Sequence, residues 1–229
     1  MALAEWQSVA QIIDHTNLRP EATGEAITGL CDEAQQFGLG AVMLNPCYVA
    51  LAAARLKGTP VKVGSVVGFP LGATLTTVKQ FEAAKVLEAG AREIDMVLHV
   101  GALKGGDRAL VASDILAVAE LVHRERALLK VILETGLLTE EEKKLACRIS
   151  VDAGADLVKT STGFLGGVAT VEDVALMRGE VGSRAGVKAS GGIRSARDAR
   201  AMIAAGATRL GTSSGVAIVR ELRAEAGER

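Results

Sequence analysis

Aromatic residues are scarce in this sequence, at 3% of 229 residues, and Lys and Arg form no basic cluster. Proteins that hold nucleic acid rely on aromatic stacking and on basic grooves. The 26 basic residues are balanced by 27 acidic ones, which leaves a formal net charge of −1. We therefore expect no nucleic acid partner. A hydrophobic content of 49% indicates an ordinary globular chain with one large core.

Cysteines and long apolar runs are also few. The three cysteines are scattered and show neither a disulfide framework nor metal-ligand spacing. The longest uncharged stretch, residues 63–78, is interrupted by Gly, Pro and Thr and is too polar to cross a bilayer. The opening MALAEWQSVAQIIDHT lacks the basic and apolar segments of a signal peptide. These features favour the cytoplasm and no membrane partner.

One sequence pattern recurs along the chain. EAGAREIDM (88–96), DAGADLVKT (152–160) and AAGATRLGT (204–212) are three versions of it, and FGLGAVML (37–44) is a looser fourth. In each, an alanine-rich helical pattern ends at a glycine, which closes the helix in the left-handed conformation, and a short apolar run follows. This pattern predicts the same helix-to-strand connection at several places in the chain.

These connections, with the sequence between them, predict eight strands. The strands lie near residues 12–15, 41–45, 61–68, 93–99, 129–134, 156–160, 186–190 and 209–212. Helical patterns follow each strand, and several have capping-box spacing, at Thr139/Glu142, Thr77/Gln80, Thr170/Asp173 and Ser195/Asp198. Alternating strands and helices favour a single (β/α)8 barrel, one catalytic domain over residues 1–229. A doubly wound open sheet is the rival, although no G-x-G-x-x-G follows the first strand.

Strand alternation predicts which side chains enter the barrel lumen. In the fourth strand, EIDMVLH, the apolar set faces the helices, which turns the other set inward, namely Glu93, Asp95, Val97 and His99. By the same alternation, Lys159 and Lys188 point inward from adjacent strands. Both lie just before the loops of the C-terminal rim, where active sites of this fold occur.

Two neighbouring ammonium groups in a poorly hydrated lumen disfavour protonation, so one lysine should have a depressed pKa. A neutral amine is a nucleophile towards carbonyls and suits imine formation, with Asp95 balancing the charge and moving protons. Plainer interpretations stay open. Lys159 would then reach solvent, Asp95 would serve only as an ion-pair partner, and Glu134, at the inward end of the fifth strand, would be a structural counter-charge.

The last two loops predict an anion site. SGGIRSA (190–196) follows the seventh strand and GTSSGVA (211–217) follows the eighth. Their glycines let the backbone approach a ligand closely, and each loop leads into a helix whose first amides we expect to be free. Barrels of this fold commonly bind phosphate at these two loops, so the substrate should carry a phosphate.

Seven stretches together resemble the deoxyribose-phosphate aldolase family, from near the N-terminus to the final helix. They are IDHTNLRPEAT (13–23), VVGFPLGA (66–73), EIDMVLHVGALKGGD (93–107), KVILETGLL (130–138), AGADLVKTSTGF (153–164), VKASGGIR (187–194) and GTSSG (211–215). The resemblance implies a (β/α)8 class I aldolase. It would reversibly cleave 2-deoxy-D-ribose 5-phosphate to D-glyceraldehyde 3-phosphate and acetaldehyde, without metal or organic cofactor, as a homo-oligomer (dimer or tetramer).

The resemblance also implies residue roles. The imine-forming lysine falls on Lys159, the second lysine on Lys188 and the proton-shuttling aspartate on Asp95. Substrate and phosphate contacts fall on Thr162, Gly163, Gly191, Gly192, Arg194, Gly211, Ser213 and Ser214. Some members have a lysine after TSTG where this chain has Phe164, so phosphate binding here should rely more on backbone amides and Arg194.

Three alternative functions remain at this stage. The first is another Schiff-base aldolase acting on a different phosphorylated sugar. The second is a metal-dependent sugar-phosphate epimerase on the same barrel, for which only His15 and His99 are plausible inward histidine ligands. The third is a non-catalytic sugar-phosphate sensor, against which the constellation of Lys159, Lys188 and Asp95 argues.

Overall fold

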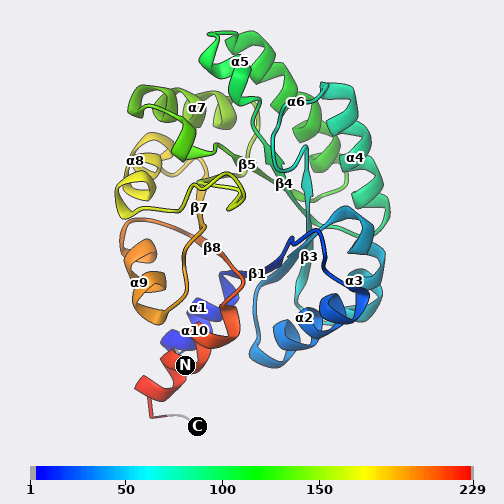
Figure 1. The fold of residues 1–229 in the computed structure, drawn as a ribbon, viewed down its shortest axis with the longest axis vertical. Coiled ribbons are helices and arrows are strands. Elements are labelled where there is room, and N and C mark those ends of the chain that lie inside the picture. Colours follow the sequence, from blue (N-terminus) through cyan, green and yellow to red (C-terminus); the bar gives the residue numbers. More distant parts are fainter. Residues whose placement is uncertain (1–3, 228–229) are drawn as a thin grey trace.

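The computed structural model describes residues 4–227 and contains a closed barrel of parallel strands in the order β1 to β8. Figure 1 shows the strands as a ring surrounded by helices. This architecture confirms the predicted (β/α)8 class. The strands are β1 (Ile13–Asn17), β2 (Ala41–Leu44), β3 (Lys62–Val67), β4 (Glu93–Val97), β5 (Leu128–Ile132), β6 (Leu157–Lys159), β7 (Gly186–Ser190) and β8 (Arg209–Thr212).

The helices cover the outside of the barrel. They are α1 (Glu5–Gln11), α2 (Gly24–Phe37), α3 (Val49–Arg55), α4 (Thr76–Glu88), α5 (Val100–Lys104), α6 (Arg108–Arg124), α7 (Glu140–Asp152), α8 (Val171–Val181), α9 (Ala196–Ala204) and α10 (Gly215–Glu225), with short 3-10 turns at Pro46–Tyr48 and Thr135–Leu137. Helix α1 lies against α10, where the Arg223 guanidinium stacks 4.0 Å from the centre of the Trp6 ring.

Three of the four predicted capping pairs lie at helix starts. Thr139 and Ser195 complete capping boxes for α7 and α9, and the Thr170 hydroxyl accepts a hydrogen bond from the backbone of the third residue of α8. The prediction at Thr77 is wrong. Helix α4 starts one residue earlier, after Leu75, whose aliphatic side chain cannot accept a capping bond.

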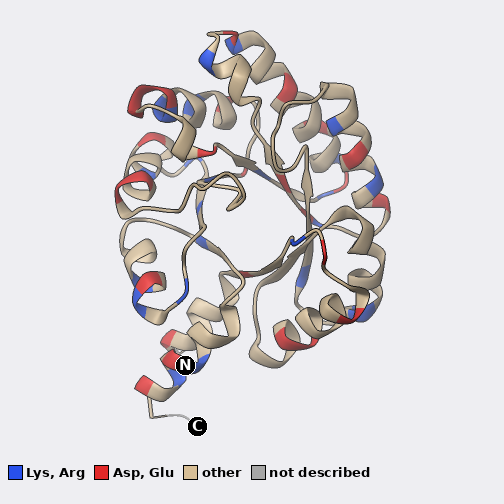
Figure 2. Cartoon of the chain, viewed as in Figure 1, with Lys and Arg blue, Asp and Glu red and all other residues tan. Residues whose placement is uncertain are grey.

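The apolar core lies between the strands and the helices. Outward-facing strand residues such as Ile94, Val158 and Val187 are buried there with the apolar faces of the helices. One ion pair is buried in this layer: Lys79 of α4 donates to Asp114 of α6 at 2.5 Å and to the carbonyl oxygen of Val97 at 3.0 Å. The lumen is different, because charged residues lie on the strands themselves as well as on the outer helices (Figure 2).

Candidate active site

The lumen has an apolar side and a charged side. Met43 of β2 and Val66 of β3 lie on the apolar side, in a small cluster with Leu18. The remaining strands supply one buried network of ion pairs within residues 4–227. Its members are four basic residues and three acidic ones: Lys130, Lys159, Lys188 and Arg209 with Asp14, Glu93 and Asp95.

Lys159 and Lys188 meet at Asp95, as strand parity predicts. The two lysines are direct partners across the β6–β7 pairing, so their side chains emerge side by side. Lys159 Nζ donates to Asp95 Oδ2 at 2.8 Å, and Lys188 Nζ donates to the same oxygen at 2.7 Å. Gly211 of β8 makes room for this arrangement, because a Cβ there would lie 3.0 Å from Lys188 Cε.

Sequence reasoning missed three members of the network, namely Lys130, Asp14 and Arg209, and placed Glu93 in the lumen without a role. Lys130 of β5 donates to Asp95 Oδ1 at 3.0 Å and to Glu93 Oε2 at 2.6 Å. Asp14 of β1 accepts from Lys188, and Arg209 of β8 bridges Asp14 and Glu93 at 2.7 Å from each. A signal was available, since Lys130 alternates with the helix-facing Leu129 and Val131 as Lys159 does with Val158.

The charge balance of the network favours one neutral lysine. Four basic groups face three carboxylates, so full ionisation would leave one positive charge in excess in a buried site. Burial disfavours the Lys159 ammonium and Lys188 repels it, and together they outweigh the attraction of Asp95, lowering the pKa of Lys159 to about 8. A much larger fraction of Lys159 is therefore neutral near physiological pH than of an ordinary lysine.

The partners of Lys159 keep their charges. Burial opposes the ionisation of Asp95, but Lys130, Lys159 and Lys188 outweigh it and hold the pKa of Asp95 well below its ordinary value. Burial also opposes the charge on Lys130, yet Asp14, Asp95 and Glu93 raise the pKa of Lys130 above its ordinary value. The site thus combines a nucleophilic amine with an ionised carboxylate that can accept a proton.

A pocket of about 710 Å³ opens beside this network at the loops that follow β1, β6, β7 and β8. Seven of the eight predicted substrate contacts line it: Thr162, Gly163, Gly191, Gly192, Arg194, Gly211 and Ser213. Ser214 lies outside the lining set as far as the structure describes the chain. Its backbone N–H donates to Thr212 Oγ1 at 2.8 Å, at the start of α10.

The expectation of free amides is wrong for α9. The backbone N–H groups of Arg194 and Ser195 donate to Asp198 at 3.0 and 3.1 Å, and that of Ala196 donates to Glu221 at 2.6 Å. Carboxylates of the chain itself thus occupy the place that an anion would take there. The groups that remain available to bind a phosphate are the glycine backbone before α9 and the N-terminus of α10.

Glu134 is a structural anchor rather than a member of the network. It is buried in the left-handed conformation at φ 58°, and its Oε2 accepts from the backbone N–H of Thr162 at 3.1 Å. This bond holds the start of the β6–α8 loop. The loop continues to Phe164, which lines the pocket.

The two histidines of the epimerase alternative have other partners. His15 Nε2 lies 2.7 Å from Glu33 Oε2, and His99 Nδ1 accepts from the backbone of Ala102 at 3.2 Å, where it caps α5. Between residues 4 and 227 the structure shows no group of three or more His, Cys, Asp or Glu residues that could hold a metal ion. No helix in the same range is long and apolar enough to cross a membrane.

Comparison with known proteins places this geometry in a family. The sequence profile of the DeoC/LacD family aldolases matches residues 8–222. The chain belongs to this family. Among its curated DeoC/LacD relatives, a deoxyribose-phosphate aldolase from Halalkalibacterium halodurans is 57% identical over 220 residues, covering 96% of this chain and 98% of the relative. One from Thermococcus gammatolerans is 59% identical over 217 residues, covering 94% and 96%.

A solved structure of the family agrees with the fold. The tetrameric deoxyribose phosphate aldolase from Aeropyrum pernix superposes with a TM-score of 0.91 at 37% identity, covering 97% of this chain and 94% of that one. The likeness therefore extends over nearly the full length of both chains.

Proposed function

We propose that this DeoC/LacD family aldolase reversibly cleaves 2-deoxy-D-ribose 5-phosphate to D-glyceraldehyde 3-phosphate and acetaldehyde through an imine on Lys159, with residues 1–229 as one catalytic domain. The names of its curated relatives support the reaction. The observation that carries the role of Lys159 is its buried amine, with a pKa of about 8, held by Asp95 beside Lys188.

The cleavage begins when the neutral Lys159 amine adds to C1 of the open-chain aldehyde. The hydroxyl of the resulting carbinolamine takes up one proton from solvent and leaves as water, which forms a protonated imine; the final hydrolysis returns that proton. The C2–C3 bond then breaks. Its electron pair moves into the enamine, and the C3 hydroxyl loses its proton to Asp95 as C3 becomes the aldehyde carbon of glyceraldehyde 3-phosphate. A proton returned to C2 gives the imine of acetaldehyde. Water then adds at C1, which releases acetaldehyde and regenerates Lys159.

Lys188 has two roles in this scheme. Its ammonium disfavours the charged form of Lys159 before the reaction, and it stabilises the ionised Asp95 as the proton acceptor. Lys130 orients the second oxygen of Asp95. Each step is carried by side chains of the chain itself, so the proposed reaction requires no metal or organic cofactor.

The substrate's phosphate is proposed to bind at the backbone of Gly191 and Gly192 and at Ser213, before the N-terminus of α10. Backbone amides approach a phosphate closely at such glycines, and the α10 dipole favours negative charge. Arg194 on the pocket wall adds a cation. This contribution matters because Phe164, which also lines the pocket, offers no charge.

We also propose that the protein forms a homo-oligomer and works in the cytoplasm. Large apolar side chains on and before α4 are exposed, with Leu75 at 70% and Phe81 at 65%, and the Aeropyrum pernix relative is tetrameric. The free thiols of Cys31, Cys47 and Cys147 suit a reducing compartment. Light scattering during size exclusion tests the assembly, and a monomer would contradict it.

Turnover assays test the function directly. Purified protein should release glyceraldehyde 3-phosphate from 2-deoxy-D-ribose 5-phosphate, and the Lys159→Met variant should not. An active enzyme that prefers a different phosphorylated sugar would instead support the alternative Schiff-base aldolase. Full activity in Lys159→Met would remove the imine mechanism.

A further inference from the structure

Two phenylalanines meet above the charged network from distant loops. Phe69 follows β3 and Phe164 follows β6, and their ring centroids lie 5.1 Å apart at an interplanar angle of 82°. Strands β4 and β5 separate β3 from β6 in the barrel, so the contact spans part of the mouth. In Figure 1 the segment between β6 and α8 curls over the barrel opening. Such edge-to-face contact is a preferred aromatic geometry.

Phe69 is the anchored member of the pair. It is half-buried and packs against the apolar cluster of Leu18, Met43 and Val66. Val66 pairs with Asp95 across the β3–β4 ladder, so this cluster lies at the level of the carboxylate that holds both lysines. The Phe69 ring therefore stands directly over the apolar side of the lumen.

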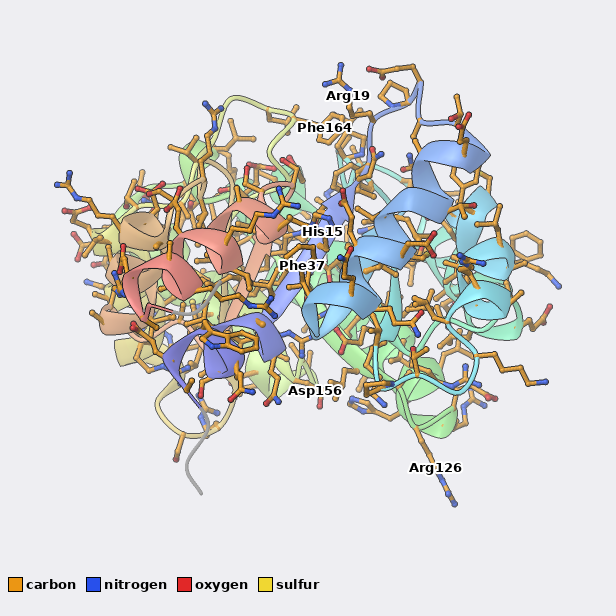
Figure 3. All side chains as sticks on the ribbon, turned by 90° about the horizontal axis from the view of Figure 1, so that it is seen from below. His15, Arg19, Phe37, Arg126, Asp156 and Phe164 are labelled. Carbon is orange, nitrogen blue, oxygen red and sulfur yellow. The ribbon has the colours of Figure 1, made fainter. Side chains whose placement is uncertain are left out.

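Phe164 is the movable member. Its side chain is 45% exposed, and it lies between Gly163 and Gly166, both with positive φ, at 82° and 79°. Figure 3 shows it at the same end of the molecule as Arg19, opposite Asp156 and Arg126. The loop is fixed below it by Glu134 and beyond it by the bond from Ala169 to Gly191. Phe164 thus stands on a short glycine-flanked segment between two fixed points.

Lys159 and Lys188 are almost completely buried. Lys159 is only 2% exposed, and within the part of the chain that the structure describes, the pocket lining includes Phe164 but neither lysine nor Asp95. In this arrangement the pocket lining therefore separates a bound sugar from the Lys159 amine. The substrate must therefore displace part of the wall between pocket and lumen.

We propose that Phe164, closing against Phe69, is a gate that opens to admit the aldehyde to Lys159 and shuts over the imine and enamine. This inference rests on the imine mechanism proposed above. In the closed state the two rings exclude bulk water, which keeps the Lys159 amine desolvated and slows loss of the enamine to solvent protons. Gate opening also limits which aldehydes enter, because bulky ones must hold the rings further apart.

The test replaces Phe164, whose exposed side chain is dispensable for the core. Phe164→Ala should raise the pH-independent rate constant for borohydride-trapped acetaldehyde on Lys159 by at least about threefold, because the route no longer opens and closes. The same variant should lower kcat for sugar cleavage. Its acid limb in kcat/KM should move up by at least about half a pH unit, because water reaches Lys159 and favours the ammonium.

Three further variants make the test specific. Phe164→Tyr keeps the ring, so its trapping rate, kcat and acid limb should lie closer to the wild-type values than those of Phe164→Ala. Leu116→Ala, on the exposed face of the outer helix α6, is a truncation away from the mouth and should match the wild type. Phe69→Leu keeps an apolar contact with Leu18 and Met43 but removes the ring pair, so it should change the three measurements in the same direction as Phe164→Ala.

The outcomes separate this inference from the mechanism on which it rests. An adduct on Lys159 in the wild type, with unchanged trapping rate and acid limb in Phe164→Ala, would overturn the gate and leave the imine intact. Slower trapping in Phe164→Ala would overturn it equally. Absence of any wild-type adduct would refute the imine mechanism and the gate together.

Discussion

The electrostatic role of Lys188 leads to a quantitative prediction for Lys188→Met. Lys159 and Lys188 donate to the same Asp95 oxygen at 2.8 and 2.7 Å, so their nitrogens are at most 5.5 Å apart. Two unit charges at that distance repel by about 3 kcal/mol at an effective dielectric constant of about 20. Since one pKa unit corresponds to about 1.4 kcal/mol, removing Lys188 should raise the pKa of Lys159 by about two units.

The loss of Lys188 also leaves Asp95 freer to stabilise the Lys159 ammonium, which acts in the same direction. The pKa of Lys159 should therefore move from about 8 to about 10 in the variant. At pH 7 the neutral fraction of the amine would fall by about 100-fold. Any direct part of Lys188 in catalysis would lower the plateau of the pH–rate profile without moving its limb.

The assay is kcat/KM for sugar cleavage between pH 6 and 10, followed through coupled reduction of the released aldehyde. The acid limb of this profile reports the free enzyme's essential base. Lys143→Met is the control, because Lys143 pairs with Asp173 between the outer helices α7 and α8 and should leave the limb in place. A limb that stays near pH 8 in Lys188→Met, or moves to lower pH, would refute the electrostatic role.

The remaining predictions concern the proton acceptor, the phosphate site and the core. Asp95→Asn should lower kcat by at least about 100-fold, because the proton acceptor is lost. It should also move the acid limb below that of the wild type, because the carboxylate that favours the Lys159 ammonium is lost. A normal kcat would contradict the role of Asp95 as proton acceptor. Ser213→Asp should reduce the preference for phosphorylated over unphosphorylated deoxyribose by at least about tenfold in kcat/KM, and equal losses for both sugars would contradict the site. Asp114→Ala leaves Lys79 buried without its carboxylate and should lower the free energy of unfolding in urea by about 3–5 kcal/mol, whereas a loss below about 1 kcal/mol would show that the pair is unimportant.

Strand parity explains why much of the lumen was predictable. A strand residue beside a helix-facing apolar neighbour must point inward, and this rule places Asp95, Lys159 and Lys188 together in the lumen. The same rule applies to Lys130. Its strand is otherwise apolar, however, so the sequence also fits a buried strand without a functional residue. Asp14 and Arg209 lie near strand ends, where one residue of uncertainty in the boundary reverses the predicted face.

Features set by the packing of loops were not predictable. Spacing alone suggested a capping box at Thr77, but α4 starts at Thr76 and Leu75 takes the N-cap position. The glycine loop before α9 looked open to an anion, yet Glu221 reaches Ala196 from a helix distant in sequence. The Phe69–Phe164 contact joins loops three strands apart, and no local pattern encodes such a pairing.

The most direct test of the central role of Lys159 is chemical trapping. The protein is incubated with acetaldehyde, reduced with borohydride, digested and mapped by peptide mass spectrometry, with Lys159→Met treated in parallel. We predict an N-ethyl group on Lys159 in the wild type and none at this site in the variant. An ethyl group on Lys188 would contradict the assignment of the nucleophile, and the absence of any adduct would contradict the imine mechanism itself.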